Sequence, residues 1–213
     1  FGYARQDRMA EPNTPISSKV IADILHSVAV NHVITIDLHS AQTQGFFDMT
    51  IENITLEKQF AAYIEKHYKK DSFAIASPDA GGVKRARKIA DLVHCNDVII
   101  IDKNRYVKNK SKVMNIIGDP KDKNIIIIDD MIDTAGTICH AAAALKEKGA
   151  NHVSVMATHP VFSGNAYENL SKEDIDKIIV TNTLTVKPEL TKVDFIDISE
   201  ILAENIYQIF SHK

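Results

Sequence analysis

The run of four isoleucines from Ile125 to Ile128 is the feature that most constrains how this chain folds. β-Branched side chains favour extended backbone, and a strand that is apolar at every position has to be buried on both faces. Further apolar segments of this kind lie at 72–76, 97–102, 152–159 and 177–183. A sheet buried on both faces needs a layer of helices on each side, so the run predicts a layered α/β protein.

Segments with helical periodicity separate these predicted strands. They lie at 55–69, 83–94 and 138–148, and a closing helix is predicted at 200–210. Before them, a helix at 16–28 leads into a strand at 32–39, and a short last strand is predicted at 195–199. Strands that alternate with helices predict a central, mostly parallel sheet. In such sheets ligands bind beyond the carboxyl ends of the strands, so the chemistry is expected in the turns that follow them.

Composition narrows the class of protein. The 213 residues carry a net charge of −3, which predicts no broad attraction to nucleic acid or to an anionic membrane. No apolar run approaches the ~20 residues that span a bilayer, and no secretory signal pattern opens the sequence. The two cysteines, Cys95 and Cys139, cannot form a disulfide framework. We therefore predict a cytoplasmic protein that binds neither nucleic acid nor membrane.

The segment that follows the isoleucine run carries the clearest chemistry. We expect the strand to end at Asp129 and a helix to begin near Thr137, with small and hydroxyl side chains at 133–137. A helix N-terminus behind such a loop can bind a phosphate through backbone N–H groups. Asp129 and Asp130 would repel a phosphate, but they can accept hydrogen bonds from sugar hydroxyls. The segment predicts a sugar-phosphate site, most simply for a pentose phosphate; the alternative is an acidic strand end before an ordinary helix cap.

The stretch 125–137 resembles the phosphoribosyl-binding motif of the phosphoribosyltransferase fold. Four further segments resemble the ribose-phosphate pyrophosphokinases: YARQD (3–7), DLHSAQTQGFFD (37–48), SPDAGGVKRA (77–86) and TNT (181–183). Members of that family transfer the β,γ-diphosphoryl group of ATP to the 1-hydroxyl of ribose 5-phosphate. The resemblance therefore implies an Mg²⁺-dependent enzyme with ATP and ribose 5-phosphate as substrates, and phosphoribosyl pyrophosphate and AMP as products.

The same resemblance assigns roles to individual residues. The ribose 5-phosphate site would contain Arg105, Asp129, Asp130, Asp133, Thr134, Ala135, Gly136 and Thr137. The residues implied at the ATP site are Arg5, Gln6 and His39. The implied catalytic residues are Lys103 and Arg105. The implied Mg²⁺ site contains Asp37, His39 and Asp79.

Physical arguments accompany these assignments. Asp37 and His39 are two apart in the predicted strand 32–39, so they should share a face, where a carboxylate and an imidazole can hold a divalent ion or its waters. The alternative is a buried histidine that is hydrogen-bonded to an aspartate. Asp79 lies in a turn before a helix, where N–H groups can face an anion, or it serves only that turn.

The pair Lys103 and Arg105 follows the strand at 97–102. Two cations there could stabilise the charge on the transferring group, which is the main demand of phosphoryl transfer. A solvated basic loop is the alternative. No Walker loop GxxxxGK[ST] is present, so bound ATP would be held by another device.

Domain organisation also follows from the resemblance. It implies two phosphoribosyltransferase-like α/β domains with mostly parallel sheets. Residues 1–56 would form the C-terminal part of the first, incomplete domain, and 57–213 the second. Family members carry roughly ninety more residues before a segment like FGYARQD, which is too much for a tail. A homo-oligomer is implied as well, dimer-based and hexameric in the family.

Two other functions stay open. A base phosphoribosyltransferase would explain 125–137 but not the other four segments. A non-catalytic relative that binds sugar phosphate or active subunits would explain an incomplete first domain. Such relatives tend to lose the catalytic cations or the loop residues, which are present here.

Overall fold

The computed structural model describes residues 4–103, 114–172 and 174–211. The chain divides into two compact units, Phe1–Leu56 and Glu57–Lys213. The described elements of the first unit are α1 (Ser17–Ser27), β1 (His32–Ile36), the 3₁₀ helix η1 (Ala41–Phe46) and β2 (Thr50–Ile54). Strands β1 and β2 pair in parallel, with Ile36 opposite Ile54.

Strand β1 ends three residues earlier than predicted. Asp37 has a φ of +44°, which breaks the extended backbone after Ile36. Asp37 and His39 therefore do not share the face of a strand, and that part of the argument for a common site is wrong. Instead, the Asp37 N–H donates to the carbonyl of Ile54 (2.8 Å), so the chain turns while it stays tied to β2.

In the described part of the second unit, strands form one sheet in the order β5-β4-β3-β6-β7-β8-β9. The strands are β3 (Phe73–Ser77), β4 (Val98–Lys103), β5 (Met114–Ile117), β6 (Asn124–Ile132), β7 (His152–Pro160), β8 (Lys177–Thr181) and β9 (Val193–Ile196). All neighbours are parallel except β5, which runs antiparallel to β4. The predicted α/β class with a mostly parallel sheet is thereby confirmed.

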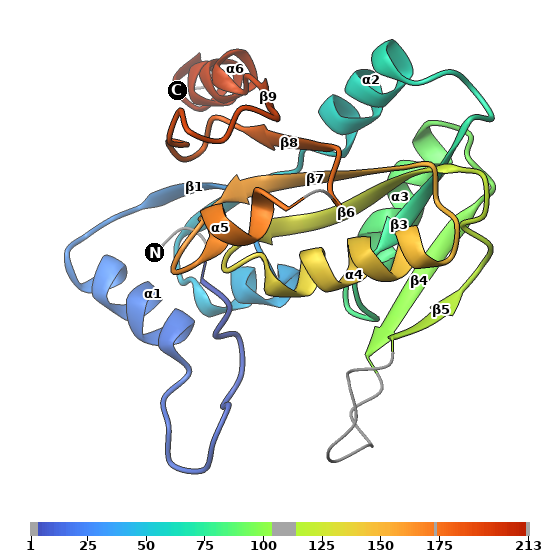
Figure 1. Cartoon of the computed structure of the whole chain (residues 1–213). Helices are drawn as coiled ribbons and strands as arrows, with labels where there is room; N and C mark the ends of the chain where they lie inside the picture. The colour runs from blue at the N-terminus through green and yellow to red at the C-terminus, as the bar shows by residue number, and fades with distance from the viewer. Residues whose placement is uncertain (1–3, 104–113, 173, 212–213) are drawn as a thin grey trace. The chain divides into compact units, whose positions relative to one another are not determined.

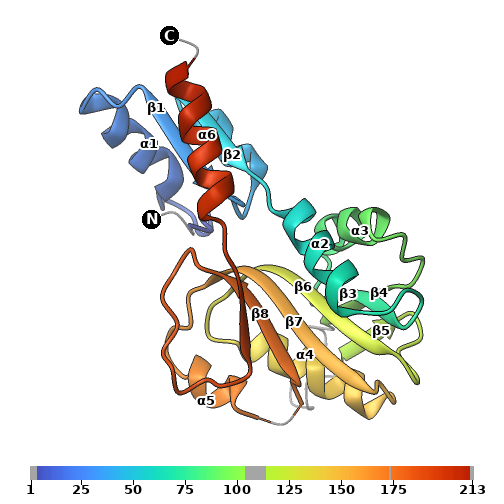
Figure 2. The ribbon, with the colours of Figure 1, turned by 90° about the horizontal axis from the view of Figure 1, so that it is seen from above.

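Helices cover both faces of this sheet. The covering helices are α2 (Glu57–His67), α3 (Val83–Leu92), α4 (Gly136–Glu147) and α5 (Ala166–Leu170). The last helix of the unit, α6 (Ser199–Ser211), has no buried residue. Figures 1 and 2 show α4 and α5 on one face and α2 and α3 on the other. Ile125 and Ile127 pack in the core cluster with α4, whereas Ile126 and Ile128 are equally buried but lie outside that cluster. Both faces of β6 are covered, which explains its unbroken isoleucine run.

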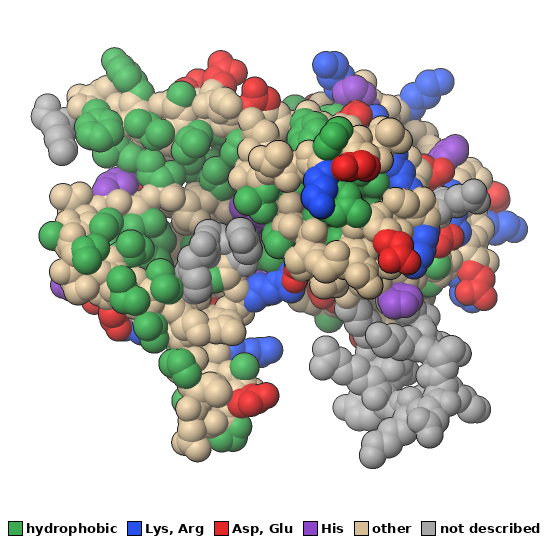
Figure 3. Space-filling view, turned by 60° about the vertical axis from the view of Figure 1, so that its left-hand side comes forward, with side chains coloured by type: hydrophobic (Ala, Val, Ile, Leu, Met, Phe, Trp, Pro, Cys, Tyr) green, Lys and Arg blue, Asp and Glu red, His purple; other side chains and the backbone are tan. Residues whose placement is uncertain are grey.

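Helices α1 and α6 have several exposed apolar side chains. On α1 and at its C-cap, Val20, Ile24 and Val28 recur every four residues and are 44%, 51% and 66% exposed. On α6, Tyr207 and Phe210 are 73% and 67% exposed. Figure 3 shows hydrophobic side chains exposed at the molecular surface. Within the described residues, no helix is both long and apolar enough to cross a bilayer.

Candidate functional site

The acid pair lies inside β6 rather than at its end. The strand continues through Asp129 and Asp130 to Ile132, because β7 pairs with it along its whole length as far as Pro160. Asp130 is 5% exposed, and its N–H donates to Oδ1 of Asp129 at 2.9 Å. Burial raises the pKa of Asp129, and the adjacent Asp130 carboxyl raises it further, because two negative charges so close repel each other.

The loop after β6 turns directly into a helix. Ala135 has a φ of +62°, a left-handed conformation that is uncommon outside glycine, and α4 begins at the next residue. The helix has no side-chain cap, so its first turn relies on other acceptors for its N–H groups. A Cβ atom added to Gly136 would meet nothing closer than Oγ1 of Thr134 at 3.9 Å. The loop thus leaves open space beside a helix N-terminus, the arrangement that an anion requires.

Residues that follow β7 hold this loop through hydrogen bonds. Ser163, which follows β7, donates its N–H to the carbonyl of Asp133 (3.1 Å) and its hydroxyl to the Asp133 carboxylate. Asn169 of α5 donates its Nδ2 to the carbonyl of Thr134 at 3.0 Å. The Asp133 carboxylate is therefore hydrogen-bonded within the protein, and its predicted place in the ribose 5-phosphate site stays a prediction. The sequence reading missed Ser163 and Asn169, because no spacing links them to a loop about thirty residues away.

The turn after β3 lies beside the same edge of the sheet. Oδ1 of Asp79 accepts the Gly82 N–H at 3.0 Å, and the Ser77 hydroxyl donates to the Asp79 carbonyl at 2.6 Å. A Cβ on Gly82 would approach Oγ of Ser77 to 2.8 Å, so a side chain there would displace the Ser77 hydroxyl. Asp79 thus does serve its turn, as the alternative interpretation had it. Its charge also contributes to the raised pKa of Asp129, which places it within electrostatic reach of the acid pair.

The ends of β7 and β8 add polar groups to this edge. His159 is 5% exposed, stands opposite Met131 of β6, and lies with its Nδ1 3.2 Å from Oγ1 of Thr183. The hydroxyls of Thr181 and Thr183 both donate to the carbonyl of Thr158, at 2.7 and 3.0 Å. The TNT segment therefore stabilises the end of β7. The sequence analysis gave His159 no role, although its place at the end of the predicted strand 152–159 could have drawn attention to it.

The residues predicted at the ATP and metal sites lie in both units. In the first unit Asp37 is buried, with its Oδ1 3.4 Å from the N–H of Leu56, whereas His39 is exposed. Arg5 and Gln6 are also exposed, and the Gln6 carbonyl accepts the Ser18 N–H at 3.3 Å. These assignments stay predictions.

One of the two predicted catalytic cations, Lys103, lies at the end of β4. Lys103 is the last residue of that strand, and its backbone pairs with Met114 of β5. The Lys103 side chain and the whole of Arg105 lie outside the described residues. Because β4 is parallel to β3 and β6 in the same sheet, its carboxyl end belongs to the same edge as the acid pair.

Comparison with known proteins gives consistent findings. A family model described as a phosphoribosyl synthetase-associated domain matches residues 74–213. The ribose-phosphate pyrophosphokinase of Wolinella succinogenes is 46% identical over 213 residues, which cover 100% of this chain and 68% of that protein. A protein of the same name from Shewanella oneidensis is 49% identical over 222 residues, which cover 100% and 69%.

Among solved structures, that of phosphoribosylpyrophosphate synthetase from Mycobacterium smegmatis matches with a TM-score of 0.91. It shares 35% sequence identity, over 99% of this chain and 69% of that chain. The chain thus spans roughly two thirds of the length of each of these relatives.

Proposed function

The chain belongs to the ribose-phosphate pyrophosphokinase family, and on that premise we propose that it makes phosphoribosyl pyrophosphate. The reaction would transfer the diphosphoryl group of ATP to the 1-hydroxyl of ribose 5-phosphate. The ribose oxygen forms a bond to the β-phosphorus and loses its proton to the solvent. The bond from that phosphorus to the α,β-bridging oxygen breaks, and AMP leaves. The curated relatives with this name support the activity, while the details of the site belong to the proposal.

The observation that carries the proposal is the succession of acid pair, loop and helix N-terminus between Asp129 and Thr137. A sugar phosphate presents hydroxyls at one end and a dianion at the other. The carboxylates of Asp129 and Asp130 can accept from the hydroxyls, and the N–H groups at the start of α4 can donate to the phosphate. The open space beside Gly136 leaves room for phosphate oxygens to approach the backbone.

The carboxylates fit Mg²⁺ as an ion shared with the nucleotide. Among the described residues, no group of three or more His, Cys, Asp or Glu side chains is placed to hold a metal alone. Mg²⁺ commonly takes one or two carboxylates and completes its octahedron with water and substrate phosphates, so such a group is not required. Asp79 would contribute in the second unit, and Asp37 and His39 in the first. When bound, the ion would screen the phosphate charges and orient the transferred group.

The remaining assignments follow the family pattern. Arg5 and Gln6 would contact ATP, and arginine offers a planar fork for a phosphate or for stacking on a base. Lys103 and Arg105 would stabilise negative charge on the diphosphoryl group as it transfers. The protein would form a homo-oligomer, which sedimentation velocity would test.

Phosphorus NMR of the 213-residue chain with ATP, ribose 5-phosphate and Mg²⁺ tests the activity. Signals of AMP and phosphoribosyl pyrophosphate are the expected result, and chelation of the Mg²⁺ should abolish them. If neither product forms while calorimetry shows intact ribose 5-phosphate binding, the transferase proposal fails for this chain. A non-catalytic sugar-phosphate binder would then be the better description.

Phosphorus NMR also tests the alternative that the chain is a base phosphoribosyltransferase. Adding adenine, guanine, hypoxanthine or uracil with phosphoribosyl pyrophosphate would release pyrophosphate if the chain had that activity. Because the whole chain matches ribose-phosphate pyrophosphokinases, we expect no base-dependent release of pyrophosphate.

A further inference from the structure

The backbone of the phosphate loop is held by three consecutive carbonyl contacts. The carbonyl of Ile132 accepts the Phe162 N–H (2.9 Å) and that of Asp133 accepts the Ser163 N–H (3.1 Å). The carbonyl of Thr134 accepts Nδ2 of Asn169 (3.0 Å). All three donors come from residues 161–170, which we call the brace. Three successive peptide groups of the loop are thus fixed from one side.

These contacts determine where the loop N–H groups point. In a planar trans peptide the N–H is directed opposite to the C=O, and the described chain contains no cis peptide bond. A carbonyl of Asp133 held by the brace therefore turns the N–H of Thr134 away from it. The carbonyl of Thr134 does the same for the N–H of Ala135. Two donors are directed to the side of the loop opposite the brace, beside the α4 N-terminus.

The brace also controls a charge that would oppose phosphate binding. The Asp133 carboxylate lies in the loop itself, where it would repel a dianion if it swung toward the ligand. The Ser163 hydroxyl donates to this carboxylate and so holds it on the brace side. One serine thereby fixes both the backbone and the side chain of Asp133.

The brace is rigid enough for this role. Phe162 keeps a φ of +46°, a strained conformation for a non-glycine residue, and its ring packs edge-on against Tyr167 at 5.5 Å. Ala166 and Leu170 of α5 are fully buried in the core. The thiol of Cys139 on α4 donates to the carbonyl of Asn169 at 3.3 Å, which ties α5 to the helix that the loop precedes. Strain of this kind persists only where the surrounding packing enforces it.

We propose that Ser163 and Asn169 are positioning residues that orient the loop N–H groups toward the 5-phosphate of ribose 5-phosphate. The inference rests on the proposed function, because it assumes that this loop is where the phosphate binds. Neither side chain is required to touch the substrate. Their effect would act through the peptide groups of Asp133 and Thr134.

Substitution of Asn169 with alanine tests the inference by calorimetry with ribose 5-phosphate. Loss of one hydrogen bond that fixes a donor is expected to weaken binding by about tenfold, with a thermal midpoint close to that of the unmodified chain. Asn165→Ala is the matched control, because Asn165 is an exposed asparagine at the N-cap of α5 whose side chain makes no cap hydrogen bond. The control should bind normally. Equal affinity of Asn169→Ala and Asn165→Ala would overturn the inference.

Substitution of Ser163 tests the control of charge. Ser163→Ala should weaken binding by about tenfold or more, whereas Ser163→Thr keeps the hydroxyl and should bind nearly as well as the unmodified chain. Adding Asp133→Asn to Ser163→Ala removes the released charge and should recover part of the affinity. A role in stability alone would give no recovery, and that result would count against the inference.

Amide NMR distinguishes a positioning role of the brace residues from a purely structural role. Ribose 5-phosphate should shift the N–H signals of Thr134 and Ala135 in the unmodified chain, and shift them less in Asn169→Ala at saturation. If the unmodified chain itself does not bind ribose 5-phosphate, the proposed function fails. If it binds and the brace variants bind equally well, only the present inference fails.

Discussion

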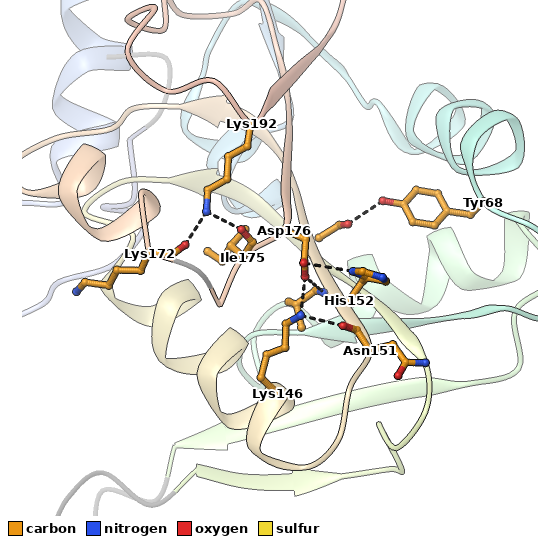
Figure 4. A network of polar contacts seen from close by, with 10 residues as sticks. Tyr68, Lys146, Asn151, His152, Lys172, Ile175, Asp176 and Lys192 are labelled. Carbon is orange, nitrogen blue, oxygen red and sulfur yellow. Dashed lines mark hydrogen bonds and ion pairs between the residues drawn. The ribbon is translucent and has the colours of Figure 1, made fainter.

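Two aspartates at opposite edges of the seven-stranded sheet have pKa values that are shifted in opposite directions. The amino edge is the one where the parallel strands begin, and the carboxyl edge is the one where they end. At the amino edge, burial alone would raise the pKa of Asp176, but its hydrogen bonds hold that pKa below the ordinary value. The donors are Nζ of Lys146 (2.8 Å), the Val153 N–H (2.7 Å) and His152 (3.2 Å). Figure 4 shows Lys146 and His152 directed toward the Asp176 carboxylate. The protein itself satisfies this charge.

At the carboxyl edge, Asp129 has the opposite shift. Burial and the neighbouring Asp130 raise its pKa, and the charge of Asp79 adds to the effect. An ionised aspartate thus stabilises the fold at the amino edge and destabilises it at the carboxyl edge. Such destabilisation is typical of sites that are completed by a ligand. Substitutions at the amino edge should therefore lower stability, and substitutions at the carboxyl edge should lower substrate binding or activity.

A pair of lysine substitutions gives the largest expected contrast. Lys103→Ala removes a cation from the carboxyl end of β4 and should lower the rate of diphosphoryl transfer by about 100-fold or more. Lys146→Ala breaks the contacts of Lys146 to Asp176 and to the Asn151 carbonyl (2.9 Å), so it should lower the thermal midpoint and leave the rate within about twofold. Phosphorus NMR and thermal unfolding measure the two effects. Equal losses of turnover and of ribose 5-phosphate affinity in Lys103→Ala would contradict a catalytic role.

Asp129→Ala should weaken substrate binding without destabilising the fold. Loss of an acceptor for a sugar hydroxyl is expected to weaken ribose 5-phosphate binding by about 10- to 100-fold. Calorimetry measures the affinity, and Asp176→Ala is the matched control at the opposite edge. Unchanged affinity in Asp129→Ala would rule out its role as a hydroxyl acceptor.

Asp176→Ala should show the reverse pattern. It removes the acceptor of the Val153 N–H and the partner of Lys146, and about a third of the Asp176 side chain is exposed, which weakens the ion pair. We expect the free energy of unfolding to fall by about 2 kcal/mol, with ribose 5-phosphate affinity unchanged in the folded protein. Urea denaturation gives the first quantity and calorimetry the second. A loss of affinity without a loss of stability would break the proposed division between the edges.

Much of the second unit follows from its sequence because its strands are apolar on both faces. The isoleucines at 125–128 could only form a doubly covered strand, and the helices at 57–67 and 83–92 were predicted within a few residues. The strand TIENI at 50–54 was missed, since its glutamate and asparagine interrupt the apolar pattern. The edge strand β5 was also missed, because four residues give too short a pattern.

The candidate site was predictable as far as it is local. The acid pair and the small-residue loop are contiguous, so their chemistry could be read from residues 129–137. The end of β6 was placed three residues early, because pairing with β7 extends the strand beyond its polar residues. Ser163 and Asn169 could not be found, because their contacts arise only when β7 brings the brace beside the loop.

Asp129→Asn should stabilise the fold, with a dependence on pH. The pKa of Asp129 is raised in the folded state, so the folded chain binds more protons than the unfolded chain above the ordinary aspartate pKa. Stability of the unmodified chain therefore falls as pH rises through that window, and the asparagine removes this loss. We expect a gain of about 1 kcal/mol at pH 8, and almost none at pH 4. Urea denaturation at both pH values measures it; a gain that is equal at pH 4 and pH 8 would contradict the electrostatic cause.

The smallest expected effect concerns the two left-handed residues that flank α4. At the amino edge of the sheet Gly149 has a φ of +91°, and an added Cβ would touch Cγ of Lys121 at 3.4 Å, so Gly149→Ala should cost about 1 kcal/mol. At the carboxyl edge Ala135 holds a φ of +62° without being glycine. Ala135→Gly removes that strain from the folded state but raises the conformational entropy of the unfolded chain. We expect the free energy of unfolding to rise by about 0.5 kcal/mol. Thermal unfolding distinguishes the signs, and a loss of stability in Ala135→Gly would mean that the loop stores no strain for its ligand to use.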